Sequence, residues 1–113
     1  MATTLVEQQL AQARENSTNA VSVFSPAANT VAVIKSIVLC NQSASPATFS
    51  IFMDNDGTTY DQNTALFYEV SLNGKQTISI DTFWAMNDPA GNLAYQSSVA
   101  NAITITIFGA VIT

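Results

Sequence analysis

Histidine is absent from this chain of 113 residues, and cysteine occurs once, as Cys40. Catalysis by Ser-His-Asp or Cys-His groups is therefore excluded in its usual form, as are zinc sites built from histidine and cysteine. A lone cysteine also allows no disulfide bond within the chain. Only four glycines are present, and neither the glycine-rich phosphate-binding motifs nor the GxSxG nucleophile motif occurs. We predict a protein that is not an enzyme and uses no cofactor.

Charged residues are equally scarce, at 10% of the chain against about 25% in ordinary globular domains. Arg14, Lys35 and Lys75 are the only positive side chains, and the net charge is −5. Because nucleic acids and anionic membranes are bound through clustered lysine and arginine, the chain is predicted to bind neither. A surface with so few charges is a poor solubiliser, which indicates that partner proteins cover part of it.

Two targeting signals are also missing from the sequence. No apolar run approaches the roughly 18 residues of a membrane-spanning helix. The N-terminus lacks the basic start and apolar core of a secretory signal. We therefore expect synthesis in the cytoplasm without insertion into a membrane.

Alternation of apolar and polar residues is the strongest pattern present. Ile103, Ile105 and Ile107 alternate with threonines, which is typical of a half-buried strand, and residues 30–41 are apolar on both faces, as in a central strand. The expected strands cover residues 20–26, 30–41, 47–54, 66–72, 76–83, 92–98 and 102–113. Seven strands separated by turn residues predict an all-β domain over residues 20–113, an antiparallel β-sandwich or jelly roll.

The N-terminal segment, residues 1–19, has no single interpretation. Its sequence "TLVEQQLAQARENS" has helical propensity but only a thin apolar stripe. Three alternatives stay open: an arm that is free or bound to a partner, a first strand around residues 10–13 followed by a polar turn, and a packed helix. Leu5 and Leu10 are its candidate partner contacts.

The stretch "DNDGTTYD", residues 54–61, places three carboxylates around a glycine and is similar at first sight to a calcium loop. The helix–loop–helix calcium motif needs acidic ligands at positions 1, 3 and 5, glycine at 6 and glutamate at 12, and neither possible register satisfies this pattern. The Asp-Gly pair between β-like segments instead predicts a hairpin turn. We predict no metal site and keep Asp54, Asp56 and Asp61 as weak candidates for a nonstandard cation site.

Four segments resemble a group of small virion proteins from tailed bacteriophages. They are "PAANT" (26–30), "VIKSIVLCNQS" (33–43), "TALFYEVSL" (64–72) and "ITITIFG" (103–109), and the resemblance spans about Val21 to Gly109. These motifs are turn and strand signatures, so the resemblance carries over no catalytic residues. It implies a structural protein located in the virion.

The resemblance implies a protein that decorates or cements the capsid by binding adjacent capsid subunits, with the major capsid protein or other virion proteins as partners. It also implies a homo-oligomer, with a trimer as the first guess. One alternative is a component of the neck, vertex, baseplate or fibre attachment. Another is a carbohydrate- or cation-binding β-sandwich that uses Trp84, Tyr60 and the three aspartates.

A cementing protein needs an apolar contact face, so large apolar side chains are the candidates for it. The candidates considered are Phe24, Tyr60, Phe67, Phe83, Trp84, Met86 and Tyr95. The segment "FWAMNDPAGN" (83–92) sets Trp84 and Met86 beside a turn, which predicts a large apolar group near a loop. The predicted partner-binding residues are Leu5, Leu10, Tyr60, Trp84 and Met86.

Overall fold

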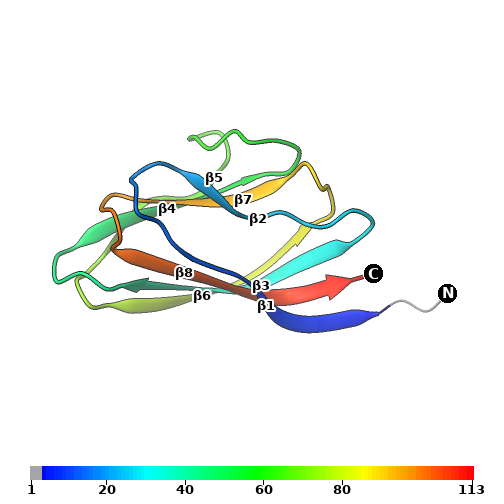
Figure 1. Ribbon diagram of the computed structural model, residues 1–113, viewed down its shortest axis with the longest axis horizontal. Helices are drawn as coiled ribbons and strands as arrows, with labels where there is room; N and C mark the ends of the chain where they lie inside the picture. Colours follow the sequence, from blue (N-terminus) through cyan, green and yellow to red (C-terminus); the bar gives the residue numbers. More distant parts are fainter. Residues whose placement is uncertain (1–3) are drawn as a thin grey trace.

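The computed structural model describes residues 4–113 and contains eight strands and no helix within that range (Figure 1). The strands are β1 (Leu5–Arg14), β2 (Val21–Phe24), β3 (Val31–Asn41), β4 (Ala47–Asp54), β5 (Ala65–Leu72), β6 (Thr77–Met86), β7 (Asn92–Ser97) and β8 (Ile103–Ile112). They form two antiparallel sheets, sheet A in the order β1-β8-β3-β6 and sheet B in the order β2-β7-β4-β5. Figure 1 shows the sheets as two layers, which confirms the predicted antiparallel β-sandwich.

The N-terminal segment forms the edge strand of sheet A. β1 pairs with β8 along its whole length, from Leu5 opposite Ile112 to Arg14 opposite Thr104. Of the three alternatives the structure has the strand, and it is longer than the expected residues 10–13. The helix is wrong, and residues 5–14 are not a free arm, because the backbone of β8 supplies their hydrogen-bonding partners. Residues 1–3 of the expected arm lie outside the described residues.

The core lies between the sheets and is built from the inward faces of the alternating strands. In β8, Ile103, Ile105 and Ile107 are each at most 1% exposed and belong to the same buried cluster as Ile37 of β3. The inward side chains of sheet B in this cluster include Phe49, Ile51, Leu93 and Tyr95. Burial of one side chain of this size stabilises the fold by about 1.5–3 kcal/mol. The predicted central position of residues 30–41 is confirmed, because β3 lies between β8 and β6.

Sheet A has an irregular line that crosses three of its strands. Leu10 in β1 and Lys35 in β3 are each an extra residue against β8, and two residues of β6 stand opposite Lys35. We call this the bulge line. Bulges bend a strand and raise its twist, so sheet A changes direction here. One consequence is that Ile34 and Ile37, three residues apart, both face the core.

Gly109 of β8 lies on the bulge line. A Cβ atom built there would stand 2.0 Å from the carbonyl oxygen of Val33 and 3.0 Å from a methyl group of Leu10. The nearer contact is with backbone, which cannot rotate away as a side chain can. A residue larger than glycine would therefore push β3 away from β8.

The buried side-chain nitrogen and oxygen atoms of the described residues all have hydrogen-bond partners. Asn41, which is 0% exposed, donates from Nδ2 to the carbonyl oxygens of Ser45 (2.9 Å) and Leu72 (3.1 Å). Its Oδ1 accepts hydrogen bonds from the backbone N–H and the hydroxyl of Ser43. One side chain thus joins the end of β3 to the β3–β4 loop and the end of β5. Among residues 4–113, no helix that could span a membrane is present.

Candidate interaction surfaces

The outer face of sheet A carries Phe83, at 78% the most exposed large apolar side chain of the described residues. Phe108 of β8 is 40% exposed on the same sheet. Strand pairing aligns Phe108 with exposed Gln9 of β1 and with Ser36 of β3, which fixes it on the outer side. Sequence reasoning had considered Phe83 but had missed Phe108. The strict alternation of residues 103–108 already sets Phe108 on the face opposite the isoleucines.

A surface ion pair lies beside Phe108. Nζ of Lys35 is 2.7 Å from Oε1 of Glu7, with side chains 40% and 68% exposed. The hydrogen bond and the positive charge of Lys35 hold the pKa of Glu7 below its usual value. Because both groups remain in water, the pair adds little stability. A hollow of about 380 Å³ adjoins it, lined by Glu7, Gln8, Gln9, Lys35, Phe108 and Gly109. We define the sheet A patch as Phe83, Phe108, Lys35 and Glu7.

Residues of the predicted contact segment point to different faces of β6 because side chains alternate along the strand. Trp84 packs against the core, with its ring centroid 6.2 Å from that of Phe67 in the other sheet. Met86 is 1% exposed and belongs to the buried cluster, so the prediction that it contacts a partner is corrected here. Their neighbour Phe83 points outward instead, because side chains alternate between the faces of a strand.

The two predicted contact residues of the N-terminal segment differ in position. Leu5 is 55% exposed, and the adjacent Val6 is 48% exposed. Leu10 is partly buried and packs against the core cluster at the bulge line. Only the first of the two predicted contacts thus offers much apolar surface.

The acidic loop joins the antiparallel neighbours β4 and β5, but it runs over residues 55–64 and Gly57 has no positive φ, so it is a long connection and not the predicted Asp-Gly turn. Asp54 accepts hydrogen bonds from the backbone N–H groups of Thr59 (2.9 Å) and Asp56 (3.3 Å), which lower its pKa. Asp61 accepts one from the N–H of Asn63 (2.8 Å). No group of three acidic or cysteine side chains among residues 4–113 is arranged to hold a metal ion. The structure therefore does not bring the three candidate carboxylates together as a cation site.

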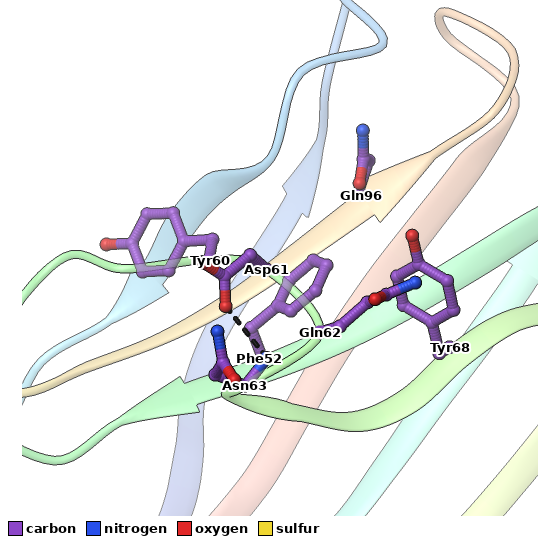
Figure 2. A pocket seen from close by; sticks show the side chains of 7 residues that line it. All are labelled: Phe52, Tyr60, Asp61, Gln62, Asn63, Tyr68 and Gln96. Atoms are coloured by element: carbon purple, nitrogen blue, oxygen red, sulfur yellow. Dashed lines mark hydrogen bonds between the residues drawn. The ribbon is translucent and has the colours of Figure 1, made fainter.

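A second recess lies on the outer face of sheet B, beneath the β4–β5 loop (Figure 2). We define the aromatic pocket by its seven lining residues, which are Phe52, Tyr60, Asp61, Gln62, Asn63, Tyr68 and Gln96. Its volume is about 400 Å³. Phe52 is its floor, and the rings of Tyr60 and Tyr68 lie on either side, with centroids 6.5 and 6.4 Å from that of Phe52. The predicted contact residue Tyr60 is thus part of a formed pocket.

Comparison with known proteins gives similarity in structure but not in sequence. No family model matches the chain, and no curated protein matches it. The VP2 protein of an infectious bursal disease virus subviral particle has 12% identity and a TM-score of 0.52, covering 97% of this chain and 32% of VP2. A chain of the infectious bursal disease virus Gx strain has 8% identity and a TM-score of 0.50, covering 98% and 31%. What they share is the fold.

A further similar structure is the tobacco streak virus coat protein, with 10% identity, a TM-score of 0.49, and coverage of 98% of this chain and 85% of that one. The present chain spans about a third of the length of the two infectious bursal disease virus chains. At 8% and 12% identity, the comparison with these two chains shows a shared fold, and the function of each neighbour belongs to that neighbour.

Proposed function

We propose that this chain is a non-enzymatic structural protein of a tailed-bacteriophage particle, which decorates or cements the capsid by binding adjacent capsid subunits. The observation that carries the proposal is the likeness of the whole sandwich to VP2 from a subviral particle, with a TM-score of 0.52 over 97% of the chain. The turn and strand motifs between Val21 and Gly109 support the narrower assignment to tailed phages. The scarcity of charge supports a surface that is partly covered by partners.

The sheet A patch is the surface proposed for this contact. Phe83 is 78% exposed, and its removal from water by a partner would be worth about 2 kcal/mol. Phe83 lies on the edge strand β6, and Phe108 and the Lys35–Glu7 pair lie across the same outer face on β8, β3 and β1, so the patch combines exposed aromatic rings with polar side chains, as protein interfaces do. Each copy would contribute modest burial, and particle symmetry would multiply it. Phe83 and Phe108 thus replace Trp84 and Met86 as proposed contact residues, and Leu5 is retained.

Homo-oligomerisation, with a trimer as the first guess, belongs to the same proposal. β1 is an edge strand of ten residues, and unpaired edges of this length favour pairing with another chain. Its outermost residues, Leu5 and Val6, are about half exposed. Covering this edge with a neighbouring copy would satisfy its backbone groups and bury both side chains.

The proposal is tested by adding purified protein to particles that lack it and measuring occupancy. Phe83→Ala should weaken binding by roughly 30-fold, the equivalent of about 2 kcal/mol. Tyr68→Ala is the matched control, because it removes an exposed aromatic ring from the opposite outer face. Phe83→Ala should melt close to the parent temperature, since exposed substitutions change stability little. Parent-like occupancy of Phe83→Ala particles would remove the sheet A patch from the proposal.

Mass spectrometry of purified particles tests the location. A copy number that matches the capsid subunits is expected for a cement protein. A number that matches the symmetry of a vertex or tail would instead favour the neck, baseplate or fibre-attachment alternative. Absence from the particle would contradict the virion proposal as a whole.

A further inference from the structure

We propose that the aromatic pocket on sheet B binds a neutral saccharide, with one sugar ring held between Tyr60 and Tyr68. The inference rests on the chemistry of the pocket and is independent of the proposed capsid contact, which uses the opposite outer face. A volume of about 400 Å³ falls in the range of roughly 300–1,000 Å³ that is usual for small-ligand sites.

The floor of the pocket is unusual for the outside of a sheet. Phe52 is 1% exposed although it lies outside the core cluster, while its neighbours Ile51 and Met53 pack with that cluster. Tyr60 from the loop and Tyr68 from β5 shield it, and Tyr68 itself stays 45% exposed. Figure 2 shows the two tyrosines on opposite sides of Phe52. The molecule thus presents three aromatic rings around one opening, with two of them accessible to a ligand.

The polar groups around these rings select the class of ligand. Gln62, Asn63 and Gln96 supply amides, and the side-chain amides of Gln62 and Asn63 make no hydrogen bond within residues 4–113. Asp61 adds a carboxylate, and no lysine or arginine lines the pocket. An anion is therefore disfavoured, and a purely apolar ligand would leave these groups without partners. A sugar ring has an apolar C–H face for the tyrosine rings and a rim of hydroxyls that both donate and accept, which this mixture matches.

The loop that covers the pocket is held in place before any ligand arrives. The Thr64 hydroxyl donates to the carbonyl oxygen of Thr59 (2.7 Å), and the N–H of Met53 donates to the carbonyl oxygen of Thr64 (2.9 Å). Nδ2 of Asn92, at the start of β7, donates to the carbonyl oxygen of Gly57 (2.8 Å) and ties the loop to sheet B. A braced loop lowers the entropic cost of binding, because little has to be ordered.

A separate, smaller recess of about 90 Å³ lies next to the pocket on sheet B. This recess is lined by Thr48, Ser50, Glu69, Gln96 and Ser98, and the two recesses share Gln96. Glu69 has a φ of 51°, a left-handed conformation that a non-glycine residue adopts at a cost, and its N–H donates to the hydroxyl of Ser50 (2.8 Å). The strained backbone and its hydroxyl partner hold Glu69 at the recess, where it supplies acceptors for the hydroxyls of a second ring. The two recesses together therefore fit an oligosaccharide better than a single sugar.

The test is a titration of the isotope-labelled full chain, followed by backbone amide NMR signals. The probes are the methyl glycosides of glucose, galactose, mannose and N-acetylglucosamine and their disaccharides, each up to about 10 mM, where a site with a Kd of about 1 mM is mostly occupied. Signals of residues 55–64, β5 and β7 should shift for at least one probe, and its disaccharide should bind more tightly. Tyr68→Ala and Tyr60→Ala should each weaken binding about tenfold or more. Phe83→Ala, on the other outer face, is the matched control and should bind like the parent.

Three results would overturn the inference. One is that no probe moves the signals of the pocket residues. A second is that a probe binds equally well to the parent and to both tyrosine variants while their spectra show intact folds. The third is that the methyl ester of acetyl-arginine binds at these residues while the sugars do not, which would assign the pocket to a cationic peptide through Asp61 and Glu69.

Discussion

Replacement of Tyr95 by phenylalanine tests how the two sheets and the first loop are joined. The Tyr95 side chain is 0% exposed, in the core cluster between the sheets. Its hydroxyl accepts a hydrogen bond from the backbone N–H of Glu15 (2.8 Å) and donates one to the carbonyl oxygen of Ile103 (3.2 Å). Tyr95 in sheet B therefore anchors both the loop after β1 and the start of β8. Phenylalanine keeps the ring and removes only these two bonds.

The expected loss follows from the two bonds. A hydrogen bond within a protein contributes about 1 kcal/mol net, and a buried group left without a partner costs about 1–3 kcal/mol. We expect Tyr95→Phe to lower the free energy of unfolding by about 2–3 kcal/mol, a large share of the 5–15 kcal/mol typical of a domain. Urea unfolding followed by circular dichroism measures this loss. The m value, which is the slope of the unfolding free energy against urea concentration, should stay unchanged because the ring remains buried.

The pH dependence supplies the control. Burial of the Tyr95 hydroxyl raises its pKa above the ordinary value of 10.0, although the hydrogen bond from Glu15 opposes the shift. A group whose pKa is raised in the folded state stabilises the fold fully below its unfolded pKa and loses that contribution as the pH rises through the folded pKa. The parent should therefore lose stability above pH 10, and its advantage over Tyr95→Phe should narrow there. A difference below about 0.5 kcal/mol, or one that stays constant above pH 10, would refute the reasoning.

Two further substitutions test the backbone contacts of the sandwich. Gly109→Ala should destabilise the fold by about 1–3 kcal/mol or abolish expression, because its Cβ would meet the Val33 carbonyl oxygen. The control, Ala110→Gly in the same strand, should cost about 1 kcal/mol or less. Thermal melting compares the two variants, and equal melting temperatures would contradict the close approach of β3 and β8 at the bulge line. Asn41→Ala should lower the free energy of unfolding, measured in urea, by about 2–4 kcal/mol, because it leaves the Leu72 carbonyl and the Ser43 N–H without their partner. A loss below about 1 kcal/mol would show that water replaces the side-chain amide.

Strand positions were predictable from the sequence wherever one face of a strand meets the core. The isoleucines of residues 103–107 alternate with threonines, and this local pattern alone fixes both the strand and its buried face. Residues 30–41 are apolar on both faces because β3 has a neighbouring strand on each side and a long buried stretch. In these segments the local strand pattern agrees with the burial that the whole fold requires, so the pattern in one sequence is sufficient to predict the strand.

The N-terminal strand was harder to predict because most of it faces water. Residues 5–9 of β1 are all exposed, so no alternation marks a buried face. Their strand conformation comes from pairing with β8, about a hundred residues away in the chain. Helical propensity of the glutamines and alanines then loses to this non-local pairing, as propensity often does.

For Trp84, the alternation of side chains along β6 predicts burial better than the size of the residue or its place near a turn. Ile78 and Ile80 pack against the core, and the same alternation continued along β6 directs Trp84 and Met86 inward and Phe83 outward. Trp84 and Met86 were nevertheless predicted as contacts because they stand near a turn.

The aromatic pocket could not be assembled from the sequence at all. Its members come from β4, the following loop, β5 and β7, and only the sheet order brings Gln96 beside Phe52.

The two proposed surfaces can be occupied at the same time because the core separates them. The sheet A patch and the aromatic pocket lie on the outer faces of opposite layers. If Phe83 contacts the particle, Tyr68 is turned away from it, so one copy can be held by sheet A while sheet B meets solvent and any saccharide in it. Binding of a saccharide should then leave particle occupancy unchanged. A contact made through the edge of β1 would give the same independence, whereas a particle contact through sheet B would make the two ligands compete for Tyr60 and Tyr68.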